Sequence, residues 1–449
     1  MIRYRGILAL LIVILALPLW GKQYFLSPEG NDRNPGTLQK PWKSLAKAGS
    51  RLKPGDQLAI LDGTYTETLS LRIPFAPSSR GQQPVYIFAV HPGKVILRPP
   101  AGAPAIRMDQ VWFAEISGLR LSGEDGGTGM VCRDSERLVF RYMDMCAPGE
   151  MDDIHTAIFL HCQLSNSGKN TSRWQIRNCS DLLWKNCTFS GKDHSIVFSG
   201  KGSGNTFHLC LFENGTSGPE LQSGPVELFL HQCSWTKAHP HSSLWKSPFV
   251  LFRRNILFSG GFPAKPEIIQ ARSTHNTIFG KRPQKMPENS VNDLFLTNKK
   301  NLRWGLHTLR LNLTHSAVDT GKAITHVRGN VSGSNVLPVN NAGFFIPQGL
   351  TRLQIPDTIW IGDSRLPARI IRVEPEKNLL YLDRAVEAEN NMPILFPAHG
   401  TAPDPGCNEL GMEYFQTAPG CRTNLPRQNS FRSIDTVAND IFIRPEKKH

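Results

Sequence analysis

Apolar residues recur along this chain with a period of about 23 residues. Cys187, Cys210 and Cys233 are each 23 residues apart. An aromatic residue follows each cysteine by two positions, at Phe189, Phe212 and Trp235. A period of this length is typical of a solenoid, and apolar positions two apart indicate a strand with one buried face.

The pattern extends in both directions from the three cysteines. It continues toward the N-terminus at Cys162, Met143 and Leu119, and toward the C-terminus at Ile256 and Thr277. Short strands with Gly-rich turns favour a parallel β-helix, and the repeat of a leucine-rich horseshoe is absent. We expect roughly nine or ten coils between about residues 85 and 300. The cysteines should then stack on the inner face as small hydrophobes.

The N-terminus has the form of a secretory signal peptide. Arg3 and Arg5 precede fourteen uncharged residues, Ile7 to Trp20. This run is shorter than the roughly 20 residues of a transmembrane helix. We therefore predict a signal peptide over residues 1–21 and a secreted, periplasmic or cell-surface protein, with a membrane anchor as the alternative interpretation. No integral membrane span is expected after cleavage.

The composition indicates an anionic partner. The chain has 51 Lys and Arg against 37 Asp and Glu, a formal net charge of +14. An excess of positive charge favours nucleic acid, a membrane surface or an acidic polysaccharide. Because an exported protein rarely meets nucleic acid, we expect an anionic polysaccharide and no nucleic-acid partner. We expect the protein to be a monomer.

Segments near both ends resemble a known group of proteins. They are Tyr24–Asp32, Lys40–Trp42, Gly63–Glu67, Asp357–Asp363 and Gly400–Gly406. These segments resemble secreted pectate-lyase-like right-handed β-helix proteins, although Pro405 and Cys407 depart from the usual ending. The resemblance implies an all-β, right-handed parallel β-helix. The spacing within Pro41–Leu52 predicts a helix that caps its N-terminal end.

The predicted organisation has four parts. After the signal peptide, residues 22–300 form the β-helix with its N-terminal cap. Residues 301–410 form closing β coils or a small β appendage, and residues 411–449 form a C-terminal tail. Cys407 and Cys421 flank a Pro- and Gly-rich segment and are close enough in sequence for a disulfide.

A candidate binding surface consists of basic residues at the repeat spacing. These are Lys185, His208, His231 and Arg254, each 23 residues apart, and His275, 21 residues further. If the position faces outward, the side chains form a stripe with steps of roughly 4.8 Å. Such a stripe suits a polyanionic chain that lies across the coils. The alternative is an ordinary solvated edge of a basic protein.

Candidate catalytic residues lie in the turns. The resemblance implies a β-elimination in which Lys or Arg acts as base and Ca²⁺ or Arg neutralises a uronate carboxylate. Histidines in two equivalent turns, and basic residues near them, are the candidates: His194, His239, His241, Lys246 and Arg253. The adjacent carboxylates Asp152 and Asp153 are the candidate Ca²⁺ ligands.

The sequence thus predicts an exported β-helix protein that acts on an anionic polysaccharide, most simply a polysaccharide lyase. A non-catalytic glycan-binding or surface-structural protein is the alternative. A glycoside hydrolase is a second alternative, and it requires two carboxylates in suitable proximity.

Overall fold

The computed structural model describes most of the chain between residues 21 and 397. The described ranges are 21–75, 83–122, 128–165, 173–191, 195–213, 218–236, 238–257, 263, 269–283, 286–288, 290–296, 302–305, 308–311, 322–345 and 357–397. The predicted signal segment (apart from Gly21), Cys407, Cys421 and the predicted tail lie outside these ranges. Within them, no helix is long and apolar enough to cross a membrane.

The 23-residue repeat builds a parallel sheet of short strands, one from each coil. Eleven strands of the described chain belong to it: β3 (Gly63–Tyr65), β6 (Val95–Leu97), β9 (Leu119–Leu121), β11 (Asp144–Met145), β13 (Gln163–Ser165), β16 (Thr188–Ser190), β19 (Leu211–Glu213), β22 (Ser234–Thr236), β24 (Ile256–Leu257), β26 (Thr277–Phe279) and β28 (Leu294–Leu296). The predicted register holds where Phe189 pairs with Phe212, and Phe212 with Trp235. The coils begin before the predicted start near residue 85.

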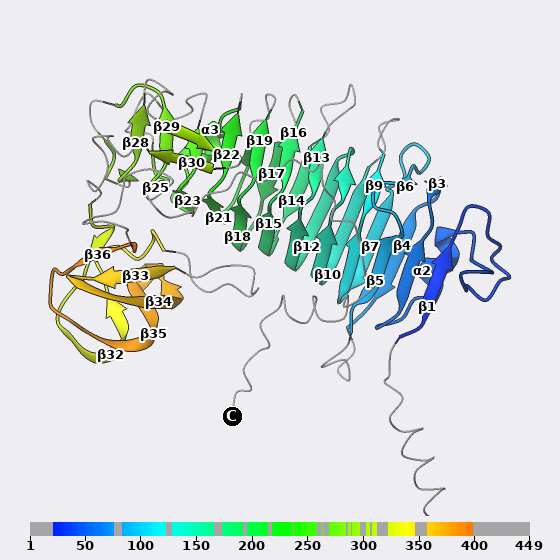
Figure 1. Ribbon diagram of the computed structural model, residues 1–449, viewed down its shortest axis with the longest axis horizontal. Coiled ribbons are helices and arrows are strands. Elements are labelled where there is room, and N and C mark those ends of the chain that lie inside the picture. Colours follow the sequence, from blue (N-terminus) through cyan, green and yellow to red (C-terminus); the bar gives the residue numbers. More distant parts are fainter. Residues whose placement is uncertain are drawn as a thin grey trace, which may run out of the picture.

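A second, larger sheet carries the longer strands of each coil. Its strands are β1 (Gln23–Leu26), β2 (Gln57–Ile60), β4 (Leu69–Ile73), β5 (Val85–Ala89), β7 (Ile106–Val111), β8 (Ala114–Ser117), β10 (Met130–Arg141), β12 (Gly149–Leu160), β14 (Trp174–Arg177), β15 (Ser180–Lys185), β17 (Ser195–Ser199), β18 (Gly202–His208), β20 (Gly218–Leu221), β21 (Val226–His231), β23 (Val250–Arg253), β25 (Arg272–Thr274) and β27 (Ser290–Val291). Successive coils lie side by side along one long axis (Figure 1). The predicted parallel β-helix is therefore confirmed.

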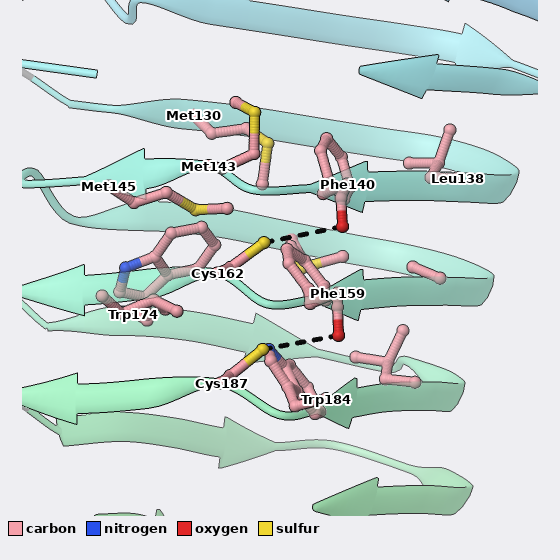
Figure 2. Packing of buried hydrophobic residues seen from close by; sticks show 14 of the residues in the cluster. Met130, Leu138, Phe140, Met143, Met145, Phe159, Cys162, Trp174, Trp184 and Cys187 are labelled. Carbon is pink, nitrogen blue, oxygen red and sulfur yellow. Dashed lines mark hydrogen bonds between the residues drawn. The ribbon is translucent and has the colours of Figure 1, made fainter. Parts of the chain in front are cut away.

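The core consists of ladders of similar side chains that stack from coil to coil. Phe140, Phe159, Trp184 and Phe207 are stacked with ring centroids 4.8, 5.3 and 4.5 Å apart. Cys162 and Cys187 lie beside these rings and donate hydrogen bonds to carbonyl oxygens, as Figure 2 shows. Burial raises the pKa of both thiols well above its usual value. The stacked cysteines are therefore inert core residues, as predicted.

A short helix, α2 (Leu45–Arg51), forms within the predicted segment Pro41–Leu52. Ser44 caps its N-terminus by accepting the N–H of Lys47. Leu45 and Ala48 are buried, and α2 lies at the N-terminal end of the coils beside β1 and β4 (Figure 1). A second helix, α3 (Ser242–Trp245), stands between β22 and β23.

After the last coil the strands pair antiparallel. β29 (Leu302–Gly305) and β30 (Thr308–Leu311) form a hairpin. A separate six-stranded antiparallel sheet, here called the C-terminal sheet, has the order β31 (Thr325–His326), β36 (Pro393–Leu395), β33 (Thr358–Ile361), β34 (Ser364–Glu374), β35 (Leu379–Ala388) and β32 (Val331–Pro338). Its apolar core includes Phe229 and Leu251 from the outer face of the β-helix. The C-terminal sheet therefore packs against the last coils.

Candidate functional site

The C-terminal ends of β15, β18, β21 and β23 carry a row of basic residues. Lys185 pairs with His208, His208 with His231, and His231 with Arg253. These four residues are called the basic row. The predicted membership of Arg254 is wrong, because the coil between β21 and β23 is one residue shorter than 23. For the same reason Asn255, and not Ile256, occupies the position of Cys233 in the next coil.

Arg254 and His275 occupy the bend itself, not the strand end. Both have positive φ, 54° in each case. Arg254 Cζ lies 4.9 Å from the ring centroid of Phe396, and His275 contacts the same ring edge-on at 5.5 Å. These two predicted binding residues therefore face the C-terminal sheet.

The basic row is less exposed and less charged than the sequence predicts. His208 is only 5% exposed, and burial lowers its pKa to about 3. Burial, and then the charge of Arg253, lower the pKa of His231 well below the usual value. Both imidazoles are therefore neutral near pH 7. Lys185 and Arg253 supply the positive charge, and Arg253 is buried in an ion pair with Asp357.

The predicted catalytic residues that the structure describes lie in two parts of one coil. His194 lies outside the described residues. His239 is exposed, and His241 caps α3 by accepting the N–H of Ser243. Lys246 is exposed at the other end of the same helix. This turn follows β22, whereas Arg253 lies at the far end of β23.

Asp152 and Asp153, the predicted Ca²⁺ ligands, each lie beside another charged or titratable side chain. Asp152 is paired with the guanidinium of Arg177 at 3.4 Å, and Asp153 with His155 at 3.3 Å. Within the described ranges, no group of three or more His, Cys, Asp or Glu side chains could hold a metal ion. A Ca²⁺ ion requires six to eight oxygen ligands, and a Ca²⁺ site at Asp152 and Asp153 stays a prediction.

A pair of carboxylates that the sequence analysis missed lies on β15 and β21. Gly204, on the intervening strand β18, donates its N–H to Glu227 Oε2 at 3.0 Å. A Cβ on Gly204 would lie 2.5 Å from Asp181 Oδ1, and its φ of +67° favours glycine. The Gly204 nitrogen and the Cβ position on the same residue are about 2.5 Å apart. Together with the two distances above, this places Asp181 Oδ1 and Glu227 Oε2 within about 8 Å of each other. The carboxylates of Asp181 and Glu227 thus converge over Gly204.

The two carboxylates have different surroundings. Burial, and then the charge of Glu227, raise the pKa of Asp181, while His155 acts in the opposite direction. Glu227 accepts the Gly204 N–H and interacts with the charge of Arg272. Asp181 therefore holds a proton more readily than an ordinary aspartate.

The repeat contains the signal that would have found this pair. Asp181, Gly204 and Glu227 are themselves 23 residues apart. Each lies four residues before a member of the basic row on the same strand, a distance of about 13 Å. Leu183, Thr206 and Phe229 lie between the two rows. One face of β15, β18 and β21 therefore carries a carboxylate pair along one side and the basic row along the other.

No family model matches the chain. A relative in Bacillus subtilis (strain 168), the uncharacterized protein YwoF, is 40% identical over 52 residues. That match spans 12% of this chain and 11% of the relative.

Several solved structures share the general architecture. Pectate lyase Pel9A has 12% identity and a TM-score of 0.43, over 70% of this chain and 94% of its own. A rhamnogalacturonan lyase has 14% identity and a TM-score of 0.34, over 62% and 86%. A tailspike protein of Acinetobacter baumannii bacteriophage Fri1, a capsular polysaccharide depolymerase, has 9% identity and a TM-score of 0.30, over 83% of each chain.

The chain has a parallel β-helix fold. The strand pairing of the chain itself carries this assignment. The resemblance that the sequence segments indicated is thereby confirmed for the fold.

Proposed function

We propose that this chain is an exported protein that binds an anionic polysaccharide on the outer face of β15 and β18 and at the start of β21, beside Glu227, and hydrolyses it. The convergence of Asp181 and Glu227 over Gly204 is the observation that carries the proposal. Glycoside hydrolysis requires one carboxylic acid and one carboxylate on either side of the scissile bond, at separations of about 5–9.5 Å. The Ca²⁺ requirement, the export and the monomeric state remain predictions.

The roles follow from the surroundings of each group. Asp181, whose pKa is raised, donates its proton to the leaving glycosidic oxygen. Glu227, held by the Gly204 amide, acts as the carboxylate that attacks the anomeric carbon or activates water. Lys185, about 13 Å along the same strand, binds an acidic group of the sugar chain. In this reaction Lys185 serves recognition and not proton transfer.

One observation favours a second reaction, the β-elimination predicted from the sequence. Lys185 is half-buried on the outer face, and burial lowers the pKa of its ammonium group. A lysine of this kind is a suitable base for removing the proton next to a uronate carboxylate. In that case Lys185 is the base, and the carboxylate pair is not required for bond cleavage.

Product chemistry separates the two reactions. The full chain is incubated with polygalacturonate, alginate and chondroitin sulfate, and reducing ends and ultraviolet absorbance are measured together. Hydrolysis yields reducing ends without an unsaturated product, whereas β-elimination yields both. We expect Asp181→Asn and Glu227→Gln each to lower the rate at least about 100-fold. The matched control is Glu150→Gln, which removes a partly exposed carboxylate on β12 that is paired with Arg133 on β10.

The pH profile provides an independent check. Because the pKa of Asp181 is raised, the rate should fall as the pH rises through that pKa and the proton donor is lost. An ultraviolet-absorbing product that persists in Asp181→Asn and disappears in Lys185→Met would overturn hydrolysis and establish elimination. Binding without any product would establish the non-catalytic alternative.

A further inference from the structure

Exposed aromatic rings lie at both ends of the row that contains the carboxylate pair. Phe75 is 49% exposed and Phe249 is 46% exposed. Leu228 on β21 pairs with Val250 on β23. The residues before them, Glu227 and Phe249, therefore occupy equivalent positions on neighbouring coils. At the opposite end, Phe75 packs on Trp112 with ring centroids 4.3 Å apart.

Arg137 lies between the pair Phe75–Trp112 and the carboxylates. Its Cζ lies 5.1 Å from the Trp112 ring centroid. Arg137 immediately precedes Leu138, and the pairing of Leu138 with Ala157 and of Ala157 with Leu182 places Arg137 two strands before Asp181 in the same row. Glu136 lies 3.5 Å from Arg137 and adds a hydrogen-bond acceptor at this end. The row therefore carries charged groups between exposed aromatic rings at its two ends.

The dimensions of the row indicate an extended ligand. From the coil of Trp112 to that of Phe249, the chain passes through β8, β10, β12, β15, β18, β21 and β23. Six strand spacings amount to about 29 Å. The carboxylate pair lies within this span. The two aromatic positions are separated by polar residues and form no continuous apolar patch of the kind that protein partners cover.

We infer that Phe75–Trp112 and Phe249 are two distal sugar-stacking subsites for one polysaccharide chain that lies along the long axis of the β-helix. The flat C–H face of a sugar ring packs on an aromatic ring, while its hydroxyl and acidic groups bind neighbouring Arg and Glu side chains. This inference rests on the proposed function, since the same polymer must pass the carboxylates. It adds that the ligand is a long chain, because a short oligosaccharide cannot contact both ends.

Binding is tested in the catalytically impaired Asp181→Asn background, so that the polymer stays intact. Affinity for polygalacturonate, alginate and chondroitin sulfate is measured by titration calorimetry and compared with that for trisaccharides of the same sugars. We expect Phe75→Ala with Trp112→Ala, and separately Phe249→Ala, to weaken polymer binding at least about fivefold. In at least one of these two variants, the affinity for the trisaccharides should change less than twofold.

The controls separate stacking from a loss of folding. Tyr381→Ala removes an aromatic–arginine pair of the same kind from the C-terminal sheet, where Arg372 lies 3.8 Å from the ring centroid, and should bind as the parent does. Trp112→Phe keeps a ring and should retain affinity. Normal polymer binding by both alanine variants would overturn the inference and leave the proposed function standing. Failure of the parent to bind any of the three polymers would overturn both.

Discussion

Three histidines, His208, His231 and His275, lie at or next to the bend of successive coils with little or partial exposure to solvent. His208 stacks on His231 with ring centroids 4.8 Å apart, and its Nε2 is bonded to Gln232 Oε1 at 3.0 Å. His275 is 2% exposed. Burial lowers the pKa of His208 to about 3 and those of His231 and His275 well below the usual value. The fold therefore keeps these side chains neutral.

Protonation of these histidines opposes folding. In the unfolded chain a histidine binds a proton below its ordinary pKa of about 6.5, whereas in the folded chain His208 does so only near pH 3. Stability should therefore fall as the pH drops below about 6.5, by up to about 1.4 kcal/mol per pH unit for each histidine. We expect His208→Phe to remove one histidine's share of this slope between pH 6 and pH 4, measured by urea unfolding. An unchanged slope, equal to that of the exposed control His239→Phe, would contradict the assignment.

At the scale of the elements, one side chain at each bend donates a hydrogen bond to a backbone carbonyl of the preceding coil. Cys210 and Cys233 donate to the carbonyl oxygens of Trp184 and Phe207 at 3.3 Å. Asn255 takes over this contact by donating to Leu230 O at 2.7 Å, and it also accepts the N–H of Cys233. The ladder therefore changes from thiols to amides toward the C-terminal end.

The amide part of the ladder should contribute more stability than the thiol part. Asn276 donates to Phe252 O and accepts from both the backbone and the side chain of Asn255, all in the buried core. Its replacement by alanine leaves several buried groups without partners, at a cost of about 3 kcal/mol. Cys210→Ala loses a weak donor and a small volume, at a cost of about 1 kcal/mol. Urea unfolding of the two variants measures the difference. Equal losses in the free energy of unfolding would show that the side-chain amide hydrogen bonds add no stability beyond that of the thiols.

The ladder also shows how far the sequence could predict the structure. Stacked cysteines and aromatic residues at a constant spacing of 23 predicted the sheet and its register. The prediction lost the register after Cys233, because one coil is a residue shorter and apolar residues at both Ile256 and Phe258 hid the change. That single residue moved Arg253 into the basic row and Arg254 onto the bend. The carboxylate pair was missed because Gly204, which joins it, carries no side chain to mark the repeat.

At the scale of the whole molecule, the C-terminal sheet changes the role of the last coils. Phe229 and Leu251 belong to its apolar core, although they lie on the outer face of the β-helix. Arg253 is paired with Asp357, 104 residues further along the chain, and lies 5.3 Å from the Phe396 ring. No repeat links such distant positions. The sequence therefore indicated a candidate catalytic residue at Arg253, where the fold has a buried ion pair.

This ion pair provides the final prediction. Asp357→Ala would leave the Arg253 guanidinium buried beside His231 without its carboxylate, and we expect a loss of about 3–5 kcal/mol in the free energy of unfolding. Arg253→Met combined with Asp357→Leu removes both charges and should return to within about 1 kcal/mol of the parent. Asp383→Leu, which breaks the exposed pair with Arg369, should cost less than about 1 kcal/mol. Urea unfolding of all four chains tests this order. A double variant as unstable as Asp357→Ala would show that the stabilisation comes from contacts other than charge compensation.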